Sequence, residues 1–234
     1  MQPERYSSIS QSAAGYDAGL RTHMQRIYNR MTLGVLVTAL TSYIVASTPA
    51  LLTLFLGGPQ AYVIMFAPLA VIWFGFNPMK MDSSKLRLSF FAISILYGIS
   101  FAVILLAFTG ENIARAFFIA TAMFAGLSIF GYTTKKNLDG MMSFLIMGVI
   151  GILVMSVLNM FIFQSAALFD LISAVGIVVF AGVTAWQTQS MKEMYNPAIG
   201  EEGNSRMAWS AALTLYISFI ALFQYILHFV SQNR

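Results

Sequence analysis

Polar side chains recur along the last long apolar segment of the chain, residues 207–230. They are Ser210, Thr214, Ser218 and Tyr225, with His228 close by. Spacings of three, four and seven residues place them on one face of a helix. In lipid such a face must contact protein or water. The stripe therefore indicates either hydrogen bonds between helices, worth about 0.6 kcal/mol each, or a narrow hydrated path along the helix.

Two other features share this ambiguity. The preceding apolar segment carries the polar residues Thr184 and Gln187, which fit either interhelical hydrogen bonds or a path. His228 fits either an amphipathic anchor at the membrane interface or a pH-sensitive residue. Both interpretations of each feature stay open at the level of the sequence.

Residues that support catalysis elsewhere are absent or scattered. There is no Cys, and the two histidines, His23 and His228, lie far apart. All nine Asp and Glu residues fall in the N-terminal tail, in loops or at the ends of apolar segments. Proton relays, aspartyl protease sites and buried Ca²⁺ sites need carboxylates inside the protein, and no nucleophile elbow or phosphate-binding glycine loop occurs. We therefore expect neither an enzyme nor a bound cofactor or metal.

The composition is that of a membrane protein. Of the 234 residues, 58% are hydrophobic and 9% are charged, against about 25% charged in soluble domains. The net charge of +4 comes from basic residues in short loops, and not from a patch interleaved with aromatic residues, so no nucleic acid partner is expected. The first thirty residues have no apolar core of a signal peptide. The expected partner is the lipid bilayer.

The apolar segments predict an all-α fold with seven transmembrane helices, because about 20 residues cross the hydrocarbon layer. The expected spans cover about residues 31–46, 61–76, 88–108, 113–132, 141–163, 168–188 and 207–230. Residues 1–20 are interpreted as a disordered tail, and residues 21–234 as one transmembrane domain without a visible repeat. The short piece 51–56 before Gly57-Gly58-Pro59 is either a loop segment or a re-entrant one.

The basic residues predict an orientation. Eleven lie on one side of the expected spans, and only Arg115 and Arg234 lie on the other. The eleven are Arg5, Arg21, Arg26, Arg30, Lys80, Lys85, Arg87, Lys135, Lys136, Lys192 and Arg206. By the positive-inside rule the tail is cytoplasmic and, with seven spans, the C-terminus is outside.

Three separated segments resemble the bacterial branch of the Bax inhibitor-1 (transmembrane Bax inhibitor motif) family. They read GYTTKKNLDGMMSFLIMGVIGILVMSVLNMF at Gly131–Phe161, VGIVVFAGVTAWQTQSMK at Val175–Lys192 and LTLYISFIALFQYIL at Leu213–Leu227. The resemblance implies six helices wrapped around a central C-terminal helix in a bacterial inner membrane. It also implies a pH-sensitive calcium leak, or, as in some relatives, modulation of a membrane-bound AAA protease.

In the family two aspartates, one late in the sixth helix and one in the seventh, share a proton and lock the pore. Here the motif positions hold Gln187 after Trp186, and Ser218 after Ile217. Neither residue can ionise, so we expect a neutral contact without pH gating and with weak divalent binding. The latch or pore candidates are Gln187, Ser218, Thr184, Ser210, Thr214 and Tyr216, with His228 as the candidate pH-sensitive residue. Ca²⁺ or another cation in transit, or a membrane protease or other membrane protein, is the expected partner.

Overall fold

The computed structural model describes the backbone of residues 3–232 and the side chains of residues 16–232. This part of the chain is helical apart from short connections and contains no strand, which confirms the all-α prediction. The elements are α1 (Pro3–Ser47), α2 (Pro49–Leu56), α3 (Gln60–Gly75), α4 (Ser83–Ala107), α5 (Gly110–Thr133), α6 (Asp139–Leu158) with the π-helical turn η1 (Asn159–Phe163), α7 (Ala166–Glu193), the 3-10 turn η2 (Pro197–Ile199) and α8 (Gly200–Gln232).

Six of these helices are long and apolar enough to cross a membrane. A seventh span results if α2 and α3 count as one, although the pair is bent by 77° at the Gly57-Gly58-Pro59 break. Several boundaries follow from local capping. The side chains of Asp82, Thr109 and Ser165 accept hydrogen bonds from the first turns of α4, α5 and α7, which satisfies backbone N–H groups that have no intrahelical partner.

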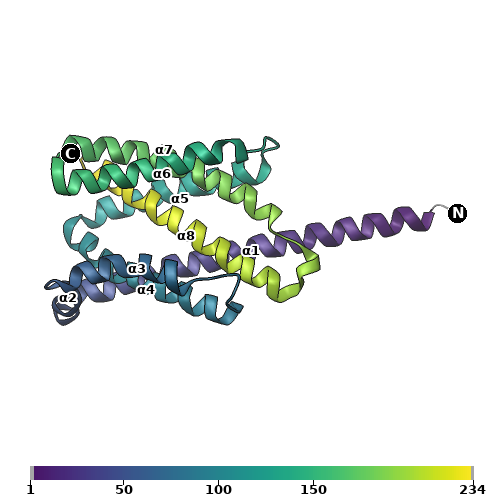
Figure 1. Ribbon diagram of the computed structural model, residues 1–234, viewed down its shortest axis with the longest axis horizontal. Coiled ribbons are helices and arrows are strands. Elements are labelled where there is room, and N and C mark those ends of the chain that lie inside the picture. The colour runs from purple at the N-terminus through teal and green to yellow at the C-terminus, as the bar shows by residue number, and fades with distance from the viewer. Residues whose placement is uncertain (1–2, 233–234) are drawn as a thin grey trace.

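The structure differs from the expected disordered tail. Residues 3–20 form the first part of α1, which runs without interruption into the membrane-spanning part and projects from one end of the bundle (Figure 1). No Pro follows Pro3 before Pro49, and extending an existing helix costs far less than starting one. The next turns of the same helix bury the side chains of Met24 and Ile27 in the bundle core. Residues 1 and 2 lie outside the described part.

Residues 189–206, which lie between the last two expected spans, are also mostly helical. The connection between the two helices is short, because α7 continues to Glu193 and α8 already begins at Gly200. Three contacts attach the start of α8 to other helices: Arg26 forms a 3.2 Å ion pair with Glu201, the Arg30 guanidinium donates at 2.8 Å to the Ser205 carbonyl, and the Ser83 hydroxyl donates at 2.7 Å to Glu202. Polar residues therefore bind this end of the bundle together.

The bundle is arranged around α8, as predicted. In its most apolar window 56% of the residues are buried, against 39% or less in the other candidate spans. α8 packs on α1 and α4 on one side and on α5 and α7 on the other, and it runs diagonally between these groups (Figure 1). α3 packs chiefly on α4, and α6 chiefly on α7. Four helices therefore form most of the immediate surroundings of α8, with α3 and α6 outside them.

The two groups share one packing pattern. In one group α1 packs against α4, and α3 packs on α4. In the other group α5 packs against α7, and α6 packs on α7. No such repeat is visible in the amino-acid sequence. If α2 and α3 together form one span, each group has three spans. The second group then crosses the membrane in the opposite direction to the first, as in inverted-repeat membrane proteins.

Candidate functional site

The two residues at the family's motif positions are in contact. The Ser218 hydroxyl of α8 donates a 2.9 Å hydrogen bond to the Gln187 side-chain oxygen of α7. Both side chains are buried, with 1% and 7% of their surface exposed. α7 and α8 also approach closely about three turns away along α7, where Gly176 has no side chain and an added Cβ atom would lie 2.8 Å from the ring of Tyr225. The contact joins two helices through neutral groups only.

This contact lies at the wall of a cavity of about 470 Å³, named here the α8 cavity. The cavity is bounded by the end of α3 and by α6, α7 and α8, and Gln187, Ser210, Thr214 and Ser218 all line it. The Thr214 hydroxyl donates at 2.9 Å to the Ser210 carbonyl one turn earlier, and Thr214 is exposed. Three residues of the polar stripe of α8, Ser210, Thr214 and Ser218, therefore face this cavity, whose other lining is mainly apolar and includes no ionisable side chain.

The structure places the other two latch or pore candidates elsewhere. Thr184 is fully buried, and its hydroxyl donates at 2.8 Å to the Phe180 carbonyl of the same helix. Tyr216 is also fully buried, and its hydroxyl lies 2.7 Å from the Thr38 hydroxyl of α1. Two residues along a helix correspond to a rotation of about 200°, so Tyr216 faces away from the stripe that contains Ser218.

His228 lies on α8, far along the helix from Ser210. Its Nε2 atom is 3.2 Å from the Asp170 carboxylate in the first turns of α7, and its ring packs edge-on against Phe169 at 4.1 Å between centroids. The sequence showed Asp170 only as an acid at a span end. The antiparallel packing of α7 and α8 brings this acid to the histidine, which spacing along one helix could not reveal.

Sequence reasoning missed the residues that hold the end of α7. The Gln189 side chain accepts a 2.7 Å bond from the Leu138 amide and donates a 2.8 Å bond to the Lys136 carbonyl. The Trp186 indole donates at 3.0 Å to Asp139. These bonds attach the turn that carries Gln187 to the connection between α5 and α6. The polar run at 186–189 was the available signal, but it did not identify the partners.

Comparison with known proteins gives one consistent result. The family model described as Bax1-I, inhibitor of apoptosis-promoting Bax1, matches residues 20–234. An uncharacterized protein of Caulobacter vibrioides is 40% identical over 232 residues, covering 93% of this chain and 91% of that protein. The inner membrane protein YbhL of Escherichia coli is 33% identical over 221 residues, covering 93% of this chain and 94% of YbhL. The chain is therefore a multi-pass membrane protein of the Bax inhibitor-1 family.

Proposed function

We propose that this protein provides a slow passive path for Ca²⁺ or another cation across the bacterial inner membrane, with Gln187 and Ser218 as a neutral latch. The observation that carries the proposal is the position of the Ser218–Gln187 bond at the wall of the α8 cavity, in line with Ser210 and Thr214. Polar side chains within a bundle of apolar helices favour water-filled cavities. The inner membrane is inferred from the similarity to YbhL.

The proposed path differs chemically from one controlled by carboxylates. Hydroxyl and amide oxygens can replace part of the hydration shell of a cation, but they lack the charge that favours tight Ca²⁺ binding. No ionisable group lines the α8 cavity, so its polarity stays constant between pH 6 and 8. The proposal is a weakly selective leak with no catalytic role.

Blocking the α8 cavity is expected to lower the flux of Ca²⁺ into liposomes that contain the purified protein. Thr214→Trp should reduce the rate about tenfold, because a side chain that fills a narrow hydrated passage removes its water. Gln224→Trp is the matched control, since Gln224 is an exposed residue of the same helix that does not line the cavity. The wild-type rate should vary little from pH 6 to 8. A steep pH dependence of the wild type, or equal rates in both variants, contradicts the proposal.

A second function, regulation of a membrane protease or another membrane protein, is favoured by a different observation. The N-terminal part of α1 projects beyond the bundle, where a partner can reach it (Figure 1). The connection between α7 and α8 is a weaker candidate, because the adjacent turn of α8 is bound to α1 and α4. A membrane partner that co-purifies with the full chain and is lost on deletion of residues 1–20, together with absent flux, would favour regulation over conduction.

The proposed orientation places the N-terminus in the cytoplasm and the C-terminus outside. The reason is that eleven basic residues lie on the same side of the expected spans as the projecting N-terminal part of α1. The absence of Cys allows a direct measurement. A single Cys introduced as Gly110→Cys, at the start of α5, should react with a membrane-impermeant maleimide in intact spheroplasts. A Cys introduced as Lys135→Cys, after the end of α5, should react only after the membrane is broken. The reverse pattern would contradict the orientation.

A further inference from the structure

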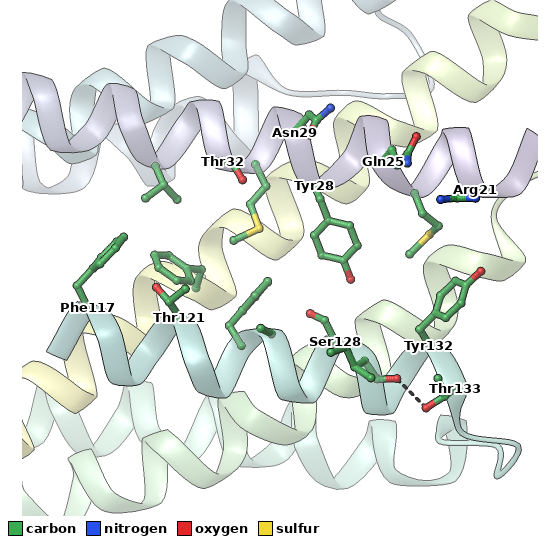
Figure 2. A pocket seen from close by; sticks show the side chains of 17 residues that line it. Arg21, Gln25, Tyr28, Asn29, Thr32, Phe117, Thr121, Ser128, Tyr132 and Thr133 are labelled. Atoms are coloured by element: carbon green, nitrogen blue, oxygen red, sulfur yellow. Dashed lines mark hydrogen bonds between the residues drawn. The ribbon is translucent and has the colours of Figure 1, made fainter. Parts of the chain in front are cut away.

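A second cavity, about 710 Å³ in volume, lies between α1 and α5 (Figure 2). Side chains of these two helices form its walls, and Phe219 of α8 contributes to its lining. We name this cavity the α1–α5 groove. Its volume lies within the range of about 300–1,000 Å³ typical of sites for small molecules. It shares no lining residue with the α8 cavity, so the proposed cation path does not account for it.

The polarity of the α1–α5 groove changes along its length. At one end Arg21 and Gln25 of α1 lie opposite Tyr132 and Thr133 of α5 (Figure 2). Hydroxyl groups of Tyr28 and Ser128 follow in the middle (Figure 2). The lining beyond them is largely apolar, with the exception of Asn29, Thr32 and Thr121, and includes Val35, Phe117 and Phe124. The order of the lining is therefore basic, then hydroxyl-bearing, then mainly apolar.

The apolar end continues into a further cavity of about 400 Å³ between α1, α4, α5 and α8. The two cavities share Val35, Phe117 and Phe219. The cavity of about 400 Å³ is lined mainly by aliphatic and aromatic side chains. An extended apolar chain that enters the α1–α5 groove therefore finds apolar surroundings beyond its end.

Ser128 indicates that the groove has an occupant with hydrogen-bonding groups. Its side chain is 93% buried, since 7% of its surface is exposed, and its hydroxyl has no hydrogen-bond partner among the described residues. The hydroxyl points into the groove toward Tyr28 (Figure 2). Thr133 on the same helix instead donates at 2.7 Å to the Ile129 carbonyl. A buried hydroxyl without a partner is destabilising, and a ligand with an ester or hydroxyl oxygen at this depth would satisfy it.

The charge at the polar end favours an anion. No Asp or Glu lines the groove, and Arg21 is exposed and makes no hydrogen bond or ion pair with the described residues. Lys135 and Lys136 follow α5 at this same end. Asp17, one turn before Arg21, does not line the groove.

The length of the groove agrees with one lipid leaflet. From Ser128 to Phe117 there are eleven residues of α5, which correspond to about 16 Å along a helix. Half of the hydrocarbon layer of a bilayer is about 15 Å thick. The distance from the hydroxyl-bearing middle to the apolar end therefore equals the depth that an acyl chain occupies below its ester group.

We infer that the α1–α5 groove binds one anionic phospholipid from the leaflet at the Arg21 end. Arg21 contacts the phosphate, the hydroxyls of Tyr28 and Ser128 contact the glycerol ester region, and an acyl chain packs against Val35 and Phe117. This inference does not depend on the proposed cation path, because the two cavities have no lining residue in common.

The test is native mass spectrometry of the purified protein in detergent, titrated with phosphatidylglycerol or with phosphatidylcholine of the same acyl chains. The wild type should retain one phosphatidylglycerol in clear preference to phosphatidylcholine. Arg21→Gln should weaken retention of phosphatidylglycerol about fivefold, the contribution of one basic residue at an anionic lipid surface. Ala125→Phe, which places a ring in the groove, should abolish retention of both lipids.

Two variants outside the groove serve as controls. Arg87→Gln removes an exposed basic residue, and Ala122→Phe adds a ring at an exposed position of α5, and neither residue lines the groove. Both should retain phosphatidylglycerol as the wild type does. Equal retention of the two lipids, or undiminished retention in Arg21→Gln, would overturn the inference. A dimer mass that Ala125→Phe abolishes would also overturn it, since the groove would then be an interface between two copies of this chain. If Ala125→Phe does not fold, Arg21→Gln and the choice between lipids decide.

Discussion

The double variant Gln187→Asp, Ser218→Asp is expected to make cation flux depend on pH, with a rate about tenfold higher at pH 8 than at pH 6. In the wild type the Gln187 oxygen and the Ser218 hydroxyl are 2.9 Å apart and buried. Two carboxyl groups at this place cannot both be ionised at low cost, so they share one proton. The shared proton forms a hydrogen bond between α7 and α8, and the latch is closed.

The direction of the effect follows from that proton. Burial and mutual repulsion raise the affinity of the carboxyl pair for a proton above that of an Asp in the unfolded chain. The stabilising hydrogen bond is therefore present at low pH and is lost as the pH rises and the proton leaves. Once the proton has left, the two carboxylates, one on α7 and one on α8, repel each other, and this repulsion opens the contact. Flux should increase with pH, and the thermal stability of the variant should decrease over the same interval.

Gln187→Asn, Ser218→Asn is the matched control, because Asn has the shape of Asp and does not ionise. Its flux in liposomes should stay constant from pH 6 to 8. The measurement is Ca²⁺ entry into liposomes at several pH values for the wild type and both double variants. A flat profile for the Asp variant, in a preparation that is folded and active, would show that the Gln187–Ser218 contact does not control the path.

Gly131→Val is expected to be strongly destabilising, by about 2–3 kcal/mol. A Cβ atom at residue 131 of α5 would overlap the backbone oxygen of Ala185 in α7 and lie 3.0 Å from its carbonyl carbon. Backbone atoms cannot rotate away as a flexible side chain can, so α5 and α7 would have to separate. The separation would also disturb the nearby turn that carries Gln187. The measurement is thermal unfolding of the purified protein in detergent.

Gly126→Ala on the same helix is the control with the opposite expectation. An added Cβ atom at this position meets nothing within 4 Å, and replacing Gly by Ala inside a helix stabilises by about 1 kcal/mol. The unfolding temperature should stay the same or rise. Similar losses of stability at both glycines would mean that helix propensity or lipid contact, and not the α5–α7 approach, determines the result.

Hydropathy predicted which parts of the chain cross the membrane, but it underestimated how far the helices extend. The ends of α4 and α5 lie within a few residues of the expected limits. Residues 3–20 and much of 189–206 are polar and were expected to be irregular, yet they are helical. Hydropathy reports contact with lipid, whereas a helix that has crossed the membrane continues until a cap or proline stops it.

The candidate site could be predicted only in part. Helical spacing placed Ser210, Thr214 and Ser218 on one face, and the structure shows that face at the α8 cavity. Tyr216 entered the prediction because it belongs to the family motif, but its hydroxyl lies next to Thr38 on the other side of α8. Ser128 gave no signal, because a single serine in an apolar helix is unremarkable until the position of α1 is known. Pairings between distant helices are not encoded in spacing along one helix.

The position of α8 at the end of the chain has a consequence for biosynthesis. Both groups of three spans leave the ribosome before α8 does, and domains form in the order of synthesis. Until α8 is inserted, the inward-facing surfaces of α1, α4, α5 and α7 have no common partner, since direct contact between the groups is small. The final assembly of the bundle can therefore take place only after translation of the last span. A premature stop codon near the 3′ end of the coding sequence removes the centre of the protein, and not a dispensable terminus.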